Sequence, residues 1–170
     1  HGAAAFEHHG DLPRADVQGG AATVLVGAFA GVESPARHDT PLVGIDLSLA
    51  GEGATALGVD AAFEHGVVVL QGAVTVDDQR VEPGHLAYLG QGRDELVVAA
   101  GEPTRLLLLG GEPFEATPLM WWNYVARTRD EVQAAHDDWE AGSDRFAPTG
   151  SALPRIPSAA PPPGLRVRRP

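Results

Sequence analysis

The sequence predicts a mainly β protein, folded as an antiparallel barrel or sandwich, with one helix and an extended tail near its C-terminal end. Many short segments alternate apolar and polar residues, and turn-forming residues separate them at a spacing of roughly ten residues. A helix-capping pattern and then a proline-rich stretch follow these segments. The 170 residues suffice for one domain with a substantial core.

The clearest strand is expected at Leu42–Leu49, where apolar residues occupy every second position from Val43 onward. This period of two is typical of a strand with one buried face. Further strands are expected at residues 23–29, 54–59, 65–71, 73–76, 85–89, 95–100 and 104–109.

The residues between these strands have the chemistry of tight turns. Asp77-Asp78 suits a two-residue hairpin, because Asp tolerates a left-handed backbone better than most residues. In Glu82-Pro83-Gly84 the proline fixes φ and the glycine permits a positive φ. Short strands joined in this way favour an antiparallel sandwich or barrel.

One helix is predicted after the strands. Thr128 and Glu131 form a capping box, and Gly142 is a natural C-terminal stop. Before the helix, residues 120–125 are expected to form a single strand. After Gly142 the prolines forbid regular structure, so the chain is expected to continue as an extended tail. We therefore divide the chain into an N-terminal arm or linker (1–20), a barrel (21–126), a helix (127–142) and a proline-rich tail (143–170).

Composition excludes several classes of function. The formal net charge of −11 argues against a surface that binds nucleic-acid phosphates, and no apolar run is long enough to span a membrane. Without cysteine, the chain has no disulfide, thiolate catalysis or Cys-ligated zinc. A cytoplasmic protein is expected. The chain begins with His1-Gly2, with neither Met nor a signal-peptide pattern, so we expect a processed chain or the second part of a longer protein.

Residues 58–72 and 81–89 resemble a cupin core. Val69-Leu70-Gln71-Gly72 is similar to the turn that closes the first cupin motif, and Glu82-Pro83-Gly84 to the turn before the second. Cupins place two His, one Glu and a third His on facing strands to bind a divalent metal. Here the resemblance puts His65 at the position of the Glu ligand, and residues on or near Val59 and Ala61 at those of the first two His.

The third His would lie beyond residue 92, where the sequence reads Arg93-Asp94-Glu95. The turns of a cupin are thus present without its ligand set, and we predict no metal site in this chain. The fold class that this resemblance implies is a cupin, or jelly-roll-like, antiparallel β-barrel.

A wider resemblance points to one family. Gly-Gly-Glu-Pro at 110–113 and Met-Trp-Trp-Asn at 120–123 are similar to segments in the C-terminal halves of pirins, and weaker similarities extend from about residue 6 to 139. The resemblance implies a bicupin whose iron, held by three His and one Glu, lies in an N-terminal barrel outside this chain. It also implies quercetin 2,3-dioxygenase chemistry in some members and regulatory or redox-sensing roles in others.

The candidate pocket residues are His65, Glu64, His85 and Arg93. His65 and Glu64 could form a vestigial pocket base at the mouth of the barrel. The favoured interpretation of His65 is a core histidine bonded to a backbone or carboxylate partner. His85 and His38 adjoin turn residues and are expected to be exposed.

The tryptophans Trp121, Trp122 and Trp139 are candidates for a partner or interdomain surface. Alternation along one strand would place Trp121 and Trp122 on opposite faces, so that one fills the barrel. The other would pack under the helix that carries Trp139 or against the N-terminal barrel.

Three functional hypotheses follow. The first is a metal-free cupin lobe that supports a metal-binding N-terminal barrel of the same protein. The second is a stand-alone metal-dependent oxygenase that uses His38, His65 and His85. The third is a module that binds another protein through the Trp-rich segment, helix and tail, and it is compatible with the first.

Overall fold

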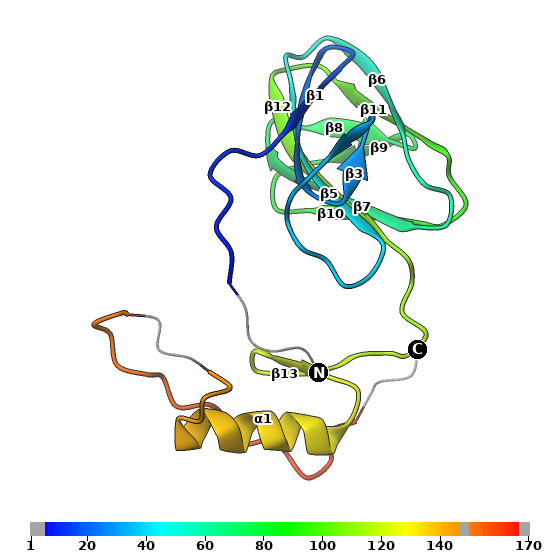
Figure 1. Ribbon diagram of the computed structural model, residues 1–170. Coiled ribbons are helices and arrows are strands. Elements are labelled where there is room, and N and C mark those ends of the chain that lie inside the picture. Colours follow the sequence, from blue (N-terminus) through cyan, green and yellow to red (C-terminus); the bar gives the residue numbers. More distant parts are fainter. Residues whose placement is uncertain (1–5, 147–149, 167–170) are drawn as a thin grey trace. The chain divides into compact units, whose positions relative to one another are not determined.

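The computed structural model describes residues 6–146 and 150–166, which form two compact units (Figure 1). The first unit is the barrel, Glu7–Pro113. The second contains the described residues from Phe114 onward, together with Phe6. Each unit has its own cluster of buried apolar side chains.

The larger sheet of the barrel has six antiparallel strands. In spatial order they are β1 (Arg14–Val17), β2 (Gly20–Val26), β5 (Leu42–Leu49), β12 (Thr104–Gly111), β7 (Glu64–Gln71) and β10 (Leu86–Gly90). The last strand of the barrel, β12, lies between β5 and β7 and pairs with both along nearly its whole length. Such pairing between distant segments is typical of jelly-roll topologies.

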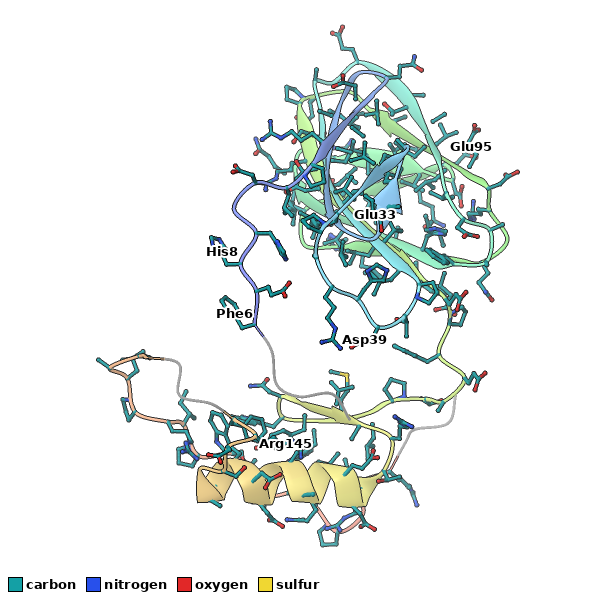
Figure 2. The ribbon with its side chains drawn as sticks, in the orientation of Figure 1. Phe6, His8, Glu33, Asp39, Glu95 and Arg145 are labelled. Carbon is teal, nitrogen blue, oxygen red and sulfur yellow. The ribbon has the colours of Figure 1, made fainter. Side chains whose placement is uncertain are left out.

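The smaller sheet has four antiparallel strands in the order β6 (Gly53–Gly58), β11 (Glu95–Ala100), β8 (Val74–Val76) and β9 (Gln79–Val81). A short pair, β3 (Ala28–Phe29) and β4 (Val32–Glu33), lies beside β5 and β2 of the larger sheet. Inward side chains of both sheets form one core, and they fill the interior of the barrel (Figure 2). Burial alternates along the strands, as the period of two predicts.

The predicted turns are confirmed. Asp77 and Asp78, with φ of 49° and 61°, join β8 to β9 as a two-residue hairpin loop. Gly84 has φ of 82°, and the His85 N–H donates to the Glu82 carbonyl across the turn.

The second unit consists of a short hairpin, β13 (Leu119–Trp121) and β14 (Tyr124–Ala126), and the helix α1 (Arg129–Ala141). The predicted capping box is present: the Glu131 N–H donates to Oγ1 of Thr128, and the Glu131 carboxylate accepts from the Thr128 N–H. Gly142 ends the helix in the left-handed conformation, as predicted.

Two sequence-based boundaries differ from the structure. Residues 14–17 of the predicted arm form β1, the edge strand of the larger sheet, while residues 1–5 of that arm lie outside the described residues. Residues 114–126, assigned to the barrel, belong to the second unit, because the β13–β14 hairpin packs on α1. Strand patterns alone do not distinguish a barrel strand from a separate hairpin.

The prediction of one strand at residues 120–125 is wrong. Trp121 pairs with Tyr124, so Trp122 and Asn123 form the two-residue loop of a hairpin. Trp122 has φ of 52°, a conformation that a bulky side chain rarely adopts. The described core of the barrel contains no tryptophan, and the rings of Trp122 and Trp139 instead pack together with centroids 5.5 Å apart.

The proline-rich tail docks on the second unit. The indole N–H groups of Trp121 and Trp139 donate to the carbonyls of Ala159 and Ile156, at 2.7 and 2.9 Å. The N–H and the hydroxyl of Ser158 both donate to the Glu140 carboxylate of α1. Over its described part the tail forms neither helix nor strand, as predicted, and follows the helix surface.

Among the described residues, no helix is long and apolar enough to cross a membrane.

Removal of the cap should destabilise the second unit. We expect Thr128→Ala to lower its unfolding free energy by about 1 kcal/mol, because the Glu131 N–H loses its acceptor. Tryptophan fluorescence in a urea titration is a direct probe, since all three tryptophans lie in this unit. Thr128→Ser keeps the hydroxyl and should unfold at nearly the wild-type urea concentration. Equal midpoints for the Ala and Ser variants would contradict the role of the cap.

Candidate functional site

His65 is the polar side chain most deeply placed in the barrel. It lies on β7, directly opposite Gly110 of β12, and only 2% of its surface is exposed. Its side chain shares the inward face of β7 with Val67 and Val69. The ring of Phe63 lies beside it, with centroids 6.2 Å apart.

The close approach of His65 to β12 depends on Gly110. A Cβ atom at Gly110 would lie 2.7 Å from Cδ2 of His65 and 3.1 Å from a methyl group of Val43. Any larger residue at this position would collide with the imidazole unless the ring moved. Gly110 therefore gives His65 the space in which it is buried.

Neither ring nitrogen of His65 has a hydrogen-bond partner among the described residues. His65 is a core histidine, as the favoured sequence interpretation expected, but the backbone or carboxylate partner expected with it is not found among the described residues. The backbone groups of β7 around His65 are paired with β10 and β12 in the sheet, and the inward neighbours of His65 are apolar. Burial lowers the pKa of His65; the charge of Asp60 opposes this effect, and that of Arg93 adds to it.

Glu64 does not join His65 in a pocket. Successive side chains of a strand point to opposite faces, so Glu64 lies on the outer face of the larger sheet while His65 points inward. There it lies near Tyr88 of β10. Desolvation, and then the charge and hydrogen bond of Glu64, raise the pKa of Tyr88.

Arg93 is held at the end of β10 by other groups. Its guanidinium forms an ion pair with Asp77, with a closest N–O distance of 2.6 Å, and its Nε donates to the Leu89 carbonyl. It thus joins the end of β10 to the β8–β9 turn. Its charge reaches His65, but it forms no hydrogen bond with the imidazole.

The three histidines of the oxygenase hypothesis are not brought together. His38 and His85 are exposed, and each lies within 3.4 Å of a carbonyl of its own turn. His85 precedes β10 at the Val69 end of β7, whereas His65 lies at the opposite end of that strand. Among residues 6–146 and 150–166, no three His, Asp or Glu side chains converge as metal ligands would.

The place of a cupin metal site is occupied by apolar side chains. Val59, at a position expected for a His ligand, packs against the core, and Ala61 is exposed. A cavity of about 200 Å³ lies at this end of the barrel. It is lined mainly by apolar groups such as Phe29, Phe63 and Leu108, with Asp60 and Asp94 at its edge. These donors do not fit a first-row metal, because two separate carboxylates and no imidazole line the space.

The three tryptophans gather in the second unit. Trp121 and Trp139 pack against the cluster that contains Tyr124, and the Trp122 ring lies 5.3 Å from that of Tyr124. Phe146 packs edge-on against Trp139 at 5.3 Å. The guanidinium of Arg155, from the tail, lies 5.2 Å from the centre of the Trp139 ring. Arg145 lies against α1, where it pairs with Asp138 (Figure 2). Much of the aromatic surface that the sequence assigned to a partner is thus covered by the chain's own tail.

Sequence reasoning missed Asp60, Phe63 and Tyr88. Asp60 and Phe63 precede β7 in a turn and meet His65 only because the chain folds back at that point. Tyr88 could have been found as an outward-facing residue, since it alternates with Ala87 and Leu89. Its proximity to Glu64 depends on the register of β10 against β7.

Comparisons with known proteins agree with this architecture. The family model of the pirin C-terminal cupin domain matches residues 44–147. A Pseudomonas aeruginosa protein, provisionally named as a quercetin 2,3-dioxygenase, is 43% identical over 144 residues, which are 85% of this chain and 46% of that protein. A pirin-like protein of Caulobacter vibrioides is 29% identical over 81% of this chain and 48% of its own length.

A solved structure gives the same fold. The crystal structure of quercetin 2,3-dioxygenase from Acinetobacter baumannii superimposes with a TM-score of 0.87 at 34% identity, over 95% of this chain and 55% of that chain. The cupin prediction is thereby confirmed. The chain spans about half the length of the curated relatives it matches.

The buried imidazole should make stability fall in mild acid. The unfolded chain takes up a proton near the ordinary pKa of 6.5, whereas folded His65 resists protonation to lower pH. As pH falls below about 6.5 the unfolded state binds more protons, so the unfolding free energy decreases, by at most about 1.4 kcal/mol per pH unit. Urea titrations between about pH 7.5 and 5.5 should show a shallower loss for His65→Gln than for wild type. His85→Gln, which changes an exposed histidine, should keep the wild-type slope; equal slopes for all three proteins would refute this role of His65.

A side chain at position 110 should destabilise the barrel. We expect Gly110→Ala to lower the unfolding free energy by about 1–3 kcal/mol, because the new methyl group overlaps His65 and Val43. Gly58→Ala is the matched control: it also lies in a strand, but its Cβ would meet nothing within 4 Å. Far-UV circular dichroism on heating measures the thermal unfolding of both variants. A Gly58 variant as unstable as the Gly110 variant would show that strand glycines matter for another reason.

Proposed function

Because this chain belongs to the pirin family, as a C-terminal cupin domain, we propose that it is the metal-free lobe of a two-barrel protein. Its role is to complete and support a metal-binding N-terminal barrel. The observation that carries the proposal is a cupin scaffold whose turns are intact while Val59 and Ala61 stand where two ligands are expected and His65 lies alone in the core.

The chemistry of metal binding supports this proposal. Iron and similar ions need three or more nitrogen or oxygen ligands that converge on one point. His65 is surrounded by Phe63, Val67 and the backbone of Gly110, which offer no such donors. The burial that lowers its pKa keeps the imidazole neutral, but a single neutral imidazole holds such an ion weakly.

For the full-length protein we propose quercetin 2,3-dioxygenase activity, with iron as the cofactor in the N-terminal barrel. Two relatives support it over a purely regulatory role: the Pseudomonas protein at 43% identity and the Acinetobacter enzyme at 34%. Both contain a second half of similar length to this chain. A stand-alone oxygenase built on His38, His65 and His85 has no geometric support, since these side chains lie apart.

Metal analysis of two proteins tests the proposal. We expect the full-length protein to hold near-stoichiometric iron and to consume oxygen with quercetin, and this chain alone to hold little iron and no activity. His65→Ala in the full-length protein should leave its iron content unchanged, whereas replacement of an iron ligand in the N-terminal barrel should abolish iron binding. Stoichiometric iron and oxygen consumption in this chain alone would overturn the proposal.

A further inference from the structure

The proline-rich tail is bound by one face of the second unit. Residues 129, 136 and 140 of α1 lie on one side of the helix, because they are spaced by seven and then four residues. The described tail, residues 150–166, runs along α1 (Figure 1). The side chains that hydrogen-bond the tail from α1 and β13 are Trp121, Arg129, His136, Trp139 and Glu140. We call these five side chains the tail-binding face.

The tail-binding face holds every third carbonyl of the tail. The acceptors are the carbonyls of Ile156, Ala159 and Pro162. Their donors, at 2.9, 2.7 and 3.3 Å, are the indole N–H groups of Trp139 and Trp121 and Nε of Arg129. Three residues is the repeat of a polyproline II helix, so carbonyls at this spacing lie along one side of such a helix. The tail-binding face therefore recognises a backbone conformation that proline-rich segments adopt.

Two further positions of the tail are recognised more closely. The N–H and hydroxyl of Ser158 donate to Glu140 at 2.7 and 3.1 Å, and its oxygen lies 2.6 Å from Nδ1 of His136. Pro161, three residues later, is buried. The tail thus presents a pattern of Pro-Ser, two further residues and a second proline, in which the hydroxyl and the second ring are the side-chain determinants.

The tail is bound less firmly than the face that binds it. Among residues 150–166 only Pro161 is buried, and Ile156 is 70% exposed. The face belongs to a capped helix and a paired strand, and the Trp139 ring packs on Trp122 and Phe146, none of which needs the tail. A segment with so little buried surface opens at low free-energy cost, while the tail-binding face stays formed.

We propose that the tail-binding face is a recognition site for proline-rich segments of other proteins, with the tail as its competing resident ligand. Most of its contacts go to main-chain carbonyls, which any polyproline II segment supplies. Aromatic side chains bind such segments in many proteins, because the conformation is preformed and its ordering costs little entropy. The tail is tethered and therefore present at high effective concentration, so a partner binds well only when the tail is displaced.

Displacement of the tail should uncover the site. The probe is a fluorescein-labelled peptide of residues 153–165, added to variants of this whole chain and followed by fluorescence anisotropy. Ser158→Glu places a second carboxylate against Glu140 and should release the tail, so the peptide should bind at least about tenfold more tightly than to wild type. Leu153→Glu is the matched control: it adds the same charge to the tail at a side chain that is 81% exposed, and it should bind as wild type does.

Two altered peptides test what is recognised, each with the Ser158→Glu chain. Glutamine in place of Ile156, Ala159 and Ala160 should change the affinity by no more than about threefold, because these exposed residues contribute carbonyls and not side chains. A peptide of the same composition in scrambled order should not bind. Equal binding of the scrambled peptide would overturn the inference.

A change in the tail-binding face should weaken the same interaction. Trp121→Phe, added to Ser158→Glu, keeps an aromatic ring but removes the indole N–H, so the affinity for the peptide should fall about fivefold. If Ser158→Glu does not fold, as judged by far-UV circular dichroism, Arg155→Gln replaces it. That change removes the guanidinium that bonds the Trp139 carbonyl and lies over the Trp139 ring, and it should also raise peptide affinity above that of wild type.

The remaining outcomes are decisive in the other direction. A folded Ser158→Glu chain that binds the peptide no better than wild type would show that the face serves only the chain's own tail, and would overturn the inference. Sedimentation of the unlabelled chains examines a second copy as the occupant. A wild-type dimer that Ser158→Glu dissociates would assign the face to the tail of another copy and overturn the inference in the same way, whereas wild type should sediment as a monomer.

Discussion

The strand β12 decides most of what is distinctive in this barrel. It lies between β5 and β7 and carries a run of four leucines, Leu106 to Leu109, that alternates between two environments. Leu106 and Leu108 point inward and are fully buried, while Leu107 and Leu109 point outward. Because alternation is strict within a strand, a shift of one residue in register would exchange the core for the surface. The buried leucines of the core and the outward leucines of this sheet are therefore two consequences of one strand.

The same strand explains the state of His65. Gly110 follows the leucines and leaves room for an imidazole that enters the core without a hydrogen-bond partner among the described residues. Burial of an unbonded polar group is unfavourable by roughly 1–3 kcal/mol, which the surrounding core must offset. A histidine is better suited to this position than a carboxylate, because it loses its charge at moderate pH. The residue that stands at the Glu-ligand position of the family is thus a neutral part of the core.

The second unit is held together in a different way. Its small cluster of Leu119, Tyr124, Val132 and Ala135 is enlarged by aromatic rings and covered by the tail. The indole N–H groups bond tail carbonyls, and Ser158 bonds α1. A chain with many prolines loses little conformational entropy when it docks, so a few such hydrogen bonds order it. The rare positive φ of Trp122 is retained because its ring packs against Tyr124 and Trp139.

The sequence by itself determined the strand content, the turns at Asp77-Asp78 and Pro83-Gly84, and the capped helix. These features depend on local chemistry: alternation, tolerance of positive φ, and side chains that reach neighbouring backbone groups. It also showed that the ligand positions of a cupin hold other residues. Only the tertiary structure decided that Glu64 and His65 lie on opposite faces of one sheet. It also decided that Trp122 lies in a turn, and that the hairpin at residues 119–126 packs on α1 and does not belong to the barrel. Pairing partners and register join residues far apart in the chain, and no local pattern at Leu86, Val68 or Leu107 records that the three lie side by side.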